Sequence, residues 1–463
     1  MMLILMLLLA LLLCPTLLLL PAAGLHIGRT EPYRSFKRLI LRAFSRPFKA
    51  TASYSRYHSL LAGVIPSFRS TYKETLLAPM QPSNQKKAAP QQVRAWAEIN
   101  LEHLRHNAEE LKWIVPSGTS IMAIVKADAY GHGGVEVAQE LNRAGIDHFA
   151  VAEIGEGVRL RKKGVRGEIL ILGYTAPELA PKLARYRLTQ TLLSREYGDA
   201  LESYGVTLNV HVKIDTGMNR LGTPYQDMGD ILASYRFPHL QVTGTFSHLS
   251  MSDGLASAET GFTKEQLRRF DQVVHHLKAA GLHPGLVHIQ SSYGILNYPE
   301  LEYDLVRPGI ALYGLLSHEG DEVKSAVDLR PVLSLKATVT QVKEVEACHP
   351  VGYGHRFMPA RNIRIATVSI GYADGIPRSL ADHGGYVLIR GQRANIIGSI
   401  CMDQLTVDVT SIGGVQQGDT VTLIGQDGAK TITASQMAER CGTVTNEILS
   451  RLGSRVERIY RYE

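Results

Sequence analysis

Lys126 and His248 are polar residues at the ends of mostly apolar segments. Both have side chains that can take part in a chemical reaction. Lys126 lies in the segment 121–127, and a lysine among apolar residues loses its hydration, which lowers its pKa and makes its amine nucleophilic. His248 ends the segment 241–248. Taken singly, each has a plainer interpretation, as a lysine that reaches solvent from a strand end or as a histidine of the core.

Small residues and an arginine end two later segments. Ser292 closes 286–292, and Arg307 in 303–308 is followed by Gly309 and Ile310. Hydroxyl groups and a glycine with free backbone N–H groups are what a phosphate site requires. A nucleophilic lysine, a phosphate site and a histidine together predict a Schiff base with pyridoxal phosphate.

The segments that carry these residues alternate with amphipathic stretches such as 135–144, 155–163 and 263–280. We expect eight strands, at 121–127, 148–152, 168–173, 188–194, 208–215, 241–248, 286–292 and 303–308. Strand–helix alternation predicts an α/β fold with a parallel sheet, and eight units favour a closed (β/α)8 TIM-type barrel over residues 93–330. Barrels place their chemistry at the C-terminal ends of the strands, which would bring these residues together. A doubly wound open sheet is the alternative, but no G-x-G-x-x-G motif opens the first helix.

Residues 331–463 predict a separate, mostly β domain. Strand patterns stand at 332–345, 363–372, 386–389, 394–409 and 420–425, followed by one helix at 434–452 and a last strand at 455–460. The early strand 94–101 has no partner in the barrel. We therefore expect it to pair with the β domain.

These segments raise a family resemblance. The run Ala-Ile-Val-Lys-Ala-Asp-Ala-Tyr-Gly-His-Gly at 123–133 resembles the cofactor-binding signature of alanine racemases, which are fold-type III pyridoxal phosphate enzymes. The resemblance extends from about residue 94 to the C-terminus. It includes 96–100, 213–222 and 306–314 in the first domain and 351–354, 370–375 and 398–404 in the second.

The resemblance implies a role for each matching residue. Lys126 would bind pyridoxal 5′-phosphate covalently and act as the base on the D side of the substrate. Tyr353, from the other subunit of a homodimer with shared active sites, would be the base on the L side. The family's substrate-carboxylate contacts match Arg220 and Met402. A lysine that is carbamylated in many members matches Lys213 and would pair with Arg220. The family's further cofactor contacts match Tyr130, His248, Ser292, Arg307, Gly309 and Ile310.

The implied reaction is the two-base interconversion of L-alanine and D-alanine, which supplies D-alanine for peptidoglycan. Removal of the Cα proton needs an electron acceptor, which the cofactor supplies. Inversion needs one acid or base on each face of the substrate, the roles of Lys126 and Tyr353. Arg307 would face the pyridine nitrogen, and its permanent charge disfavours protonation there, which limits side reactions such as transamination.

The sequence departs from the family pattern at two positions. Common alanine racemases carry a tyrosine where this chain has Ser454, and many have asparagine where it has Ser291. The stretch 445–453 looks like the membrane-linked serine/alanine racemases associated with vancomycin resistance. Activity on serine, as a serine/alanine racemase, is therefore the alternative reading.

Two other functions fit less well. A basic amino-acid decarboxylase of the same fold type would carry a Gly-rich phosphate loop and a Cys-Asp substrate motif, which are not evident here. A pyridoxal phosphate homeostasis protein would be a single barrel without a β domain.

The composition excludes several other classes. The 463 residues have a net charge of +7, but the first 90 carry 12 Lys and Arg against 2 acidic residues, so the remainder is mildly acidic and we expect no nucleic-acid partner. The 4 cysteines form no C-x-x-C pair, and we expect no metal site. Residues 1–24 form a hydrophobic leader, a membrane anchor or a signal, followed by a basic linker at 25–92. The basic cluster after the leader favours a cytoplasmic catalytic part.

Overall fold

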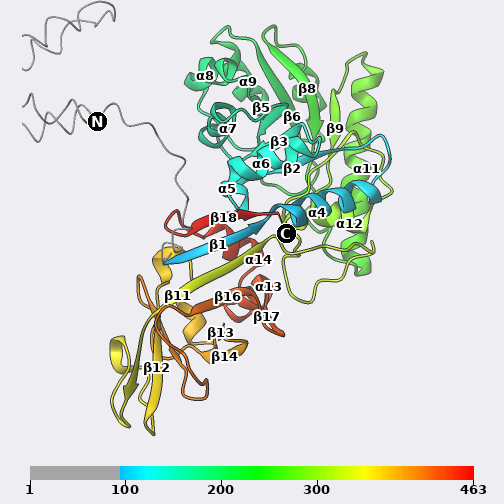
Figure 1. The fold of residues 1–463 in the computed structure, drawn as a ribbon. Coiled ribbons are helices and arrows are strands. Elements are labelled where there is room, and N and C mark those ends of the chain that lie inside the picture. Colours follow the sequence, from blue (N-terminus) through cyan, green and yellow to red (C-terminus); the bar gives the residue numbers. More distant parts are fainter. Residues whose placement is uncertain (1–93, 463) are drawn as a thin grey trace, which may run out of the picture. The chain divides into compact units, whose positions relative to one another are not determined.

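The computed structural model describes residues 94–462, which fold into a barrel and a mostly β domain (Figure 1). Eight parallel strands form the barrel in the order β5-β4-β3-β2-β10-β9-β8-β6, and β5 pairs with β6 to close it. The strands are β2 (Ser120–Ile124), β3 (His148–Val151), β4 (Glu168–Ile171), β5 (Thr189–Leu192), β6 (Leu208–Asp215), β8 (Leu240–Phe246), β9 (Leu286–His288) and β10 (Leu305–Val306). The predicted (β/α)8 barrel is therefore confirmed. A two-residue strand, β7 (Thr223–Pro224), extends the sheet beside β6.

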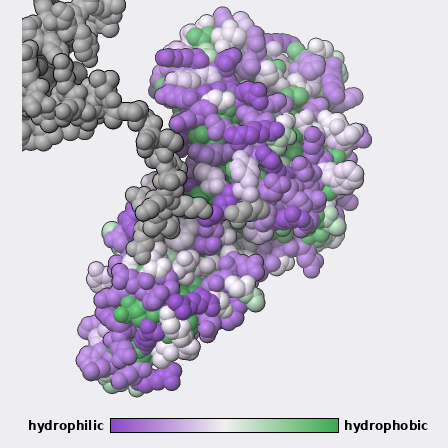
Figure 2. Space-filling model, in the orientation of Figure 1, coloured by the Kyte–Doolittle hydropathy of each residue, from purple (hydrophilic) through white to green (hydrophobic). Residues whose placement is uncertain are grey.

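Helices cover the barrel strands, and all of them except α4, which follows β1 (Ala95–Asn100), come after a barrel strand. They are α4 (Leu101–Ile114), α5 (Lys126–Tyr130), α6 (Gly134–Arg143), α7 (Ile154–Lys162), α8 (Ala180–Arg185), α9 (Arg195–Glu202), α10 (Met228–Ala233), α11 (Ser257–Ala279) and α12 (Ser292–Asn297). A polar side chain fixes the start of α4. The Asn100 side chain accepts a hydrogen bond from the backbone N–H of His103 and so caps the helix. Apolar side chains of strands and helices are buried together, and the face of the molecule in Figure 2 is mainly hydrophilic with scattered hydrophobic residues.

The β domain is built on a sheet with the strand order β14-β13-β16-β11-β1-β18. Its strands are β11 (Leu333–Val345), β12 (Ile363–Val368), β13 (Tyr386–Ile389), β14 (Gln392–Asn395), β15 (Leu405–Asp408), β16 (Thr420–Asp427), β17 (Lys430–Ile432) and β18 (Glu457–Arg461). The early strand β1 (Ala95–Asn100) lies between β11 and β18, so its predicted pairing with the β domain is confirmed (Figure 1).

Two predicted elements of the β domain are each divided in the structure. The helix expected at 434–452 is α13 (Ala434–Arg440) and α14 (Thr445–Ser450), because the backbone turns left-handed at Gly442, with a φ of 66°. The strand expected at 394–409 is β14 and β15, separated by a loop that carries Met402. Both breaks depend on turn geometry that the hydrophobic pattern does not encode.

The described residues contain no helix long and apolar enough to cross a membrane. The predicted leader and basic linker at 1–92 lie outside them.

Candidate active site

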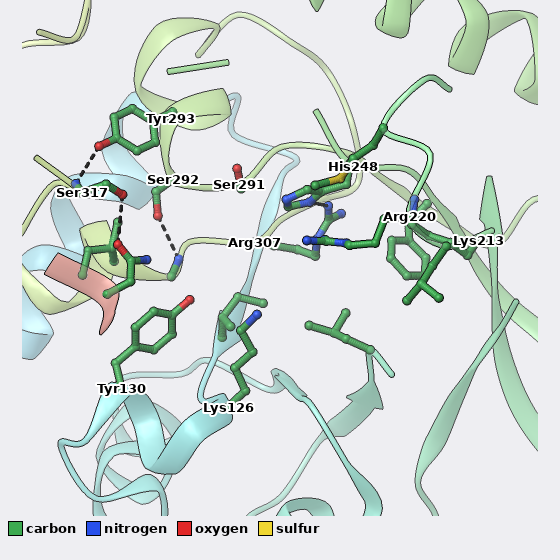
Figure 3. A pocket seen from close by; sticks show the side chains of 18 residues that line it. Lys126, Tyr130, Lys213, Arg220, His248, Ser291, Ser292, Tyr293, Arg307 and Ser317 are labelled. Carbon is green, nitrogen blue, oxygen red and sulfur yellow. Dashed lines mark hydrogen bonds between the residues drawn. The ribbon is translucent and has the colours of Figure 1, made fainter. Parts of the chain in front are cut away.

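A cavity of about 330 Å³ lies at the C-terminal ends of the barrel strands (Figure 3). Eight of the ten predicted site residues line it. They are Lys126, Tyr130, Arg220, His248, Ser292, Arg307, Gly309 and Ile310. Lys213 and Ser291 line it as well. The structure thus brings together residues from strands distant in sequence.

The turn α5 presents Lys126 and Tyr130 to the cavity. The four residues after Lys126 are left-handed, with φ of 53° at Ala127, 53° at Asp128, 54° at Ala129 and 52° at Tyr130. Four consecutive L-residues in this conformation are strained, since each costs about 1–2 kcal/mol. The strand therefore ends at Ile124 rather than at the predicted residue 127, and the left-handed turn aims both side chains inward (Figure 3).

Acidic side chains hold this turn from outside the cavity. Glu156 Oε1 accepts a hydrogen bond of 2.6 Å from the Ala127 N–H, and its Oε2 accepts one of 2.8 Å from the Ala152 N–H. Asp128 Oδ1 accepts a bond of 2.8 Å from the Gly134 N–H. These bonds fix the turn, and with it the origin of the Lys126 side chain.

The ionisable lining of the cavity is strongly cationic. Lys126, Lys213, Arg220 and Arg307 line it, and no carboxylate stands among the lining residues. Burial, followed by the charges of Arg220 and Arg307, lowers the pKa of Lys126 despite the opposing charge of Glu156. Burial, followed by the charge of Arg307, lowers the pKa of Lys213 to about 7. Both shifts raise the fraction of neutral, nucleophilic amine, and the cationic cavity favours an anionic ligand.

Arg307 is fully buried, and burial lowers its pKa to about 9. Its Nη2 donates to the carbonyls of Ser247 at 2.8 Å and Ile289 at 2.9 Å, and to His248 Nδ1 at 3.1 Å. Its Nη1 lies 2.6 Å from His288 Nδ1. Burial and the charge of Arg307 hold the pKa of His248 well below its ordinary value. A guanidinium has no acceptor, so both histidine nitrogens that face it must be unprotonated.

The tautomers of two buried histidines follow from this contact. Since His288 Nδ1 accepts from Arg307, its proton sits on Nε2, which lies 3.0 Å from His211 Nδ1. The proton of His211 is then on Nε2, which lies 3.1 Å from Glu168 Oε1, although the N–H vector is poorly aligned with that oxygen. A buried chain of polar groups therefore connects Arg307 to a carboxylate across the barrel.

The other end of the cavity is rich in hydrogen-bond donors. The Ser292 hydroxyl oxygen accepts from the backbone N–H of Gly309 at 3.0 Å and of Ala311 at 3.2 Å. A Cβ on Gly309 would lie 2.7 Å from the Tyr130 hydroxyl oxygen, so only glycine allows this close approach. Burial raises the pKa of Tyr130 to about 12, which keeps its hydroxyl a donor. Hydroxyls, amide N–H groups and neighbouring cations fit a phosphate ester, and Lys126 supplies the amine that pyridoxal phosphate requires.

Tyr353 and Met402 do not line the cavity of their own chain. Tyr353 begins the short 3-10 turn η5 (Tyr353–His355) of the β domain, and its side chain is 73% exposed. Met402 is 52% exposed. Ser454 is also exposed and lies outside the cavity lining.

Several residues that line the cavity were not predicted from the sequence. Phe246 lies two residues before His248, and alternation along a strand would have placed both on one face. Ser317 and Asn446 also line the cavity, and Asn446 comes from α14 of the β domain. No single-sequence pattern signals that contact. Among residues 94–462 no group of three or more histidine, cysteine, aspartate or glutamate side chains is placed so that it could hold a metal ion.

Comparison with known proteins adds independent evidence. Residues 99–317 match the family described as "Alanine racemase, N-terminal domain", and residues 332–460 match "Alanine racemase, C-terminal domain". The chain is 43% identical over 369 residues to an alanine racemase of Carboxydothermus hydrogenoformans, a match that covers 79% of this chain and 99% of the relative.

Other relatives are longer proteins. The chain is 43% identical over 386 residues to an amino-acid racemase of Enterococcus faecalis, covering 83% of this chain but 54% of that protein. It is 42% identical over 364 residues to a serine/alanine racemase of Enterococcus gallinarum, covering 78% of this chain and 51% of the relative. The chain thus spans about half the length of these relatives. Among solved structures, the alanine racemase of Clostridium difficile 630 superposes with a TM-score of 0.75 at 34% identity, covering 80% of this chain and 96% of that one.

Proposed function

Because the chain belongs to the alanine racemase family, we propose that it interconverts L-alanine and D-alanine with pyridoxal 5′-phosphate and supplies D-alanine for peptidoglycan. The observation that carries this proposal is the cavity itself. It combines a lysine of lowered pKa, a donor-rich phosphate end and a buried arginine, with no carboxylate in its lining. The lysine suits the aldehyde of pyridoxal phosphate, the donor-rich end suits its phosphate, and the arginine suits its pyridine ring.

Lys126 would hold the cofactor and move a proton on one face of the substrate. Its lowered pKa raises the fraction of neutral amine, the form that attacks an aldehyde and later accepts a proton at Nζ. When bound, pyridoxal phosphate withdraws electrons from the Cα–H bond and so makes that proton removable. Tyr130, Ser292, Gly309 and Ile310 would anchor the phosphate.

Arg307 would control the protonation of the pyridine ring from the opposite end of the cavity. Its N–H groups already donate to two carbonyls and face two histidine nitrogens. A group so supplied with acceptors remains a cation and does not release a proton to a ring nitrogen. We propose that this keeps the pyridine nitrogen unprotonated and suppresses transamination, while His248 lies beside the ring.

The second face of the substrate would be served by a second copy of the chain. Tyr353 is 73% exposed and Met402 is 52% exposed, and both lie outside the cavity of their own chain. We propose a homodimer in which Tyr353 of each subunit is the base on the L side at the other's cavity. Arg220 and Met402 would contact the substrate carboxylate.

Lys213 would stabilise Arg220 as a carbamate. The pKa of Lys213 is lowered to about 7, chiefly by burial, so a large fraction of its amine is neutral near neutral pH. A neutral amine is the form that adds carbon dioxide. The resulting anion would pair with the Arg220 guanidinium in a lining that otherwise has no negative charge.

A direct assay tests the main proposal. The purified protein should show the absorbance of lysine-bound cofactor and convert each alanine isomer into the other. Cofactor binding without racemisation of either isomer would overturn it, and would favour the decarboxylase or the homeostasis reading.

Serine is the second candidate substrate, and two observations favour it. One is the similarity to a serine/alanine racemase at 42% identity. The other is Ser454 where a tyrosine is usual, a position that would act from outside the cavity lining of its own chain. Discrimination by one small group is about 10- to 200-fold, so we expect serine turnover beside alanine turnover. Ser454→Tyr should reduce serine turnover at least about tenfold more than alanine turnover, or roughly 1.4 kcal/mol. Equal losses on both substrates would mean that Ser454 only supports packing, and the alanine racemase reading would stand without it.

We also propose the division of the chain into a leader at 1–24, a basic linker at 25–92, a barrel at 93–330 and a β domain at 331–463. The leader is a membrane anchor or a signal, and the basic residues after it favour a cytoplasmic catalytic part. Fractionation of cells that express the full chain distinguishes an anchored enzyme from a free one.

A further inference from the structure

Glu168 lies at the end of the barrel opposite the cavity, yet polar contacts join it to Arg307. It is the first residue of β4, whereas the cavity lies at the C-terminal ends of the strands. Its Oε1 lies 3.1 Å from His211 Nε2, and His211 Nδ1 lies 3.0 Å from His288 Nε2. His288 Nδ1 lies 2.6 Å from Arg307 Nη1. Two histidine rings thus connect a carboxylate to the guanidinium through the barrel interior.

The rings of both histidines are held in place by their neighbours, and both residues are fully buried. A Cβ on Gly244 would lie 2.6 Å from His211 Nε2, so the ring fits only beside a glycine. The His288 ring stacks on that of Phe246, with centroids 4.8 Å apart and 6° between the planes. Because neither ring can turn freely, the protons on their nitrogens decide which hydrogen bonds form.

One arrangement of these protons suits both ends of the connection. A guanidinium has only donors, so His288 Nδ1 must carry a lone pair and its proton sits on Nε2. His211 Nδ1 then accepts from that proton, and the proton of His211 sits on Nε2. Among the described residues, His211 Nε2 has no polar neighbour that could accept its proton except Glu168. The reverse arrangement would aim an N–H of His288 at Arg307 and a lone pair of His211 at the carboxylate.

A carboxylate in this place strengthens the contact at the far end. Although burial opposes it, the hydrogen bond from His211 holds the pKa of Glu168 below its ordinary value, so the group is an anion at neutral pH. A carboxylate that accepts from one nitrogen of a histidine makes the other nitrogen more basic, as it does for histidines that bind metal ions. The effect reaches Arg307, because among the described residues its hydrogen bonds go to carbonyls and to histidine nitrogens.

We propose that Glu168 is a positioning residue for Arg307. By accepting the Nε2 proton of His211, it keeps the Nδ1 lone pair of His288 aimed at the guanidinium. It contacts neither the cavity nor a ligand within it. Its effect on turnover rests on the proposed function, whereas the positions of the histidine protons depend on the protein alone.

Proton NMR of the full chain, labelled at the histidine nitrogens and free of cofactor, tests the proton positions directly. The Nε2–H signals of His211 and His288 are assigned by their loss in variants that lack each histidine. Glu168→Leu fills the space of the carboxylate but removes the acceptor, and Glu168→Gln keeps an oxygen without the charge. Glu202→Leu is the matched control, because Glu202 also accepts from a histidine, His239, in an exposed pair outside the cavity lining.

We expect the wild type to carry the protons of His211 and His288 on Nε2. The His211 signal should move to higher field in Glu168→Gln, because a neutral oxygen is a weaker acceptor, and further in Glu168→Leu. In the cofactor-loaded enzyme, kcat for alanine should fall about tenfold in Glu168→Leu with KM changed less than twofold. It should fall less than threefold in Glu168→Gln, and Glu202→Leu should match the wild type in both measurements.

A His211 proton on Nδ1 in the wild type, or a His211 signal that stays at its wild-type position in the Glu168 variants, would overturn the proposal. So would a kcat of Glu168→Leu equal to that of Glu202→Leu. If Glu168→Leu fails to fold, the shift of the His211 signal in Glu168→Gln decides. A wild type that does not racemise alanine would instead refute the proposed function, and the NMR measurement would still show whether Glu168 orients the histidines.

Discussion

Replacing Ala127 by glycine should stabilise this enzyme, although glycine usually destabilises. Ala127 has φ 53° and ψ 48°, within the left-handed turn that carries Lys126. That conformation costs an L-residue about 1–2 kcal/mol, which glycine avoids. Ala127 is exposed, so little buried area is lost with its methyl group. The hydrogen bond from its N–H to Glu156 remains, because it involves only the backbone.

The unfolded state offsets part of this gain. Glycine is more flexible than alanine in the unfolded chain, which costs about 0.5–1 kcal/mol. The net expectation is a stabilisation of about 0.5–1 kcal/mol. Ala279→Gly is the matched control, because Ala279 is exposed at the end of the right-handed helix α11. It should destabilise by up to about 1 kcal/mol. The two alanine-to-glycine changes should therefore differ in sign.

Thermal unfolding of the cofactor-loaded enzyme, at one protein and cofactor concentration, measures this difference. For a chain of this size, the midpoints of the two variants should lie about 1–3 °C apart, with Ala127→Gly the higher. Turnover by Ala127→Gly should fall a few-fold, because glycine widens the range of positions open to Lys126 and Tyr130. If Ala127→Gly melts as low as Ala279→Gly, the turn is not strained in the folded protein and the reasoning fails.

Three other predictions concern the site. Lys126→Ala should abolish both the absorbance of lysine-bound cofactor and racemisation, and a borohydride-trapped adduct in that variant would contradict the assignment. Tyr353→Phe should slow turnover from L-alanine by orders of magnitude with cofactor still bound, so near-normal exchange of the L-alanine α-proton with solvent would exclude it as that base. The pKa of Lys213 falls from 10.5 to about 7 on folding. Between pH 7 and pH 10.5 the unfolded chain therefore binds more protons at this residue than the folded chain does. Because of this difference, the free energy of unfolding rises with pH, by at most about 1.4 kcal/mol per pH unit. Lys213→Met should therefore be more stable than the wild type at pH 7 in bicarbonate-free buffer, and urea unfolding should show that advantage shrink toward about pH 9.

The barrel and most of its site could be predicted because strand ends and polar residues coincide in the sequence. Ser292 and Arg307 lie at or just after strands whose apolar runs are evident, and parallel strands bring their ends together. The same logic paired β1 with the β domain, since it had no place in the barrel. The order of the hydrophobic strand and helix patterns thus predicted where a strand lies in the fold as well as its secondary structure.

What could not be predicted depends on backbone turns and on contacts between domains. Nothing in the run Lys126–Tyr130 signals a left-handed turn, because none of its residues is glycine. Gly442, by contrast, is the kind of residue that ends a helix, and the division of 434–452 could have been read from it. The contact of Asn446 with Ser317 joins residues 129 positions apart, and no local pattern encodes such a pair.

The exposure of Tyr353 links the fold to the stereochemistry of the reaction. A barrel gathers its functional side chains at one end of its strands, and here Lys126 occupies one side of the cavity that they form. Inversion at Cα requires a second acid or base on the opposite face, and the proposed mechanism assigns that role to Tyr353. The β domain carries Tyr353 on an exposed turn, outside the cavity of its own chain. In the proposed mechanism, a chain built this way gains its second face only when another copy brings Tyr353 to it. Dimerisation would then be a condition of racemisation itself, and a monomeric variant that retains its cofactor should exchange the α-proton of D-alanine while no longer producing the L isomer.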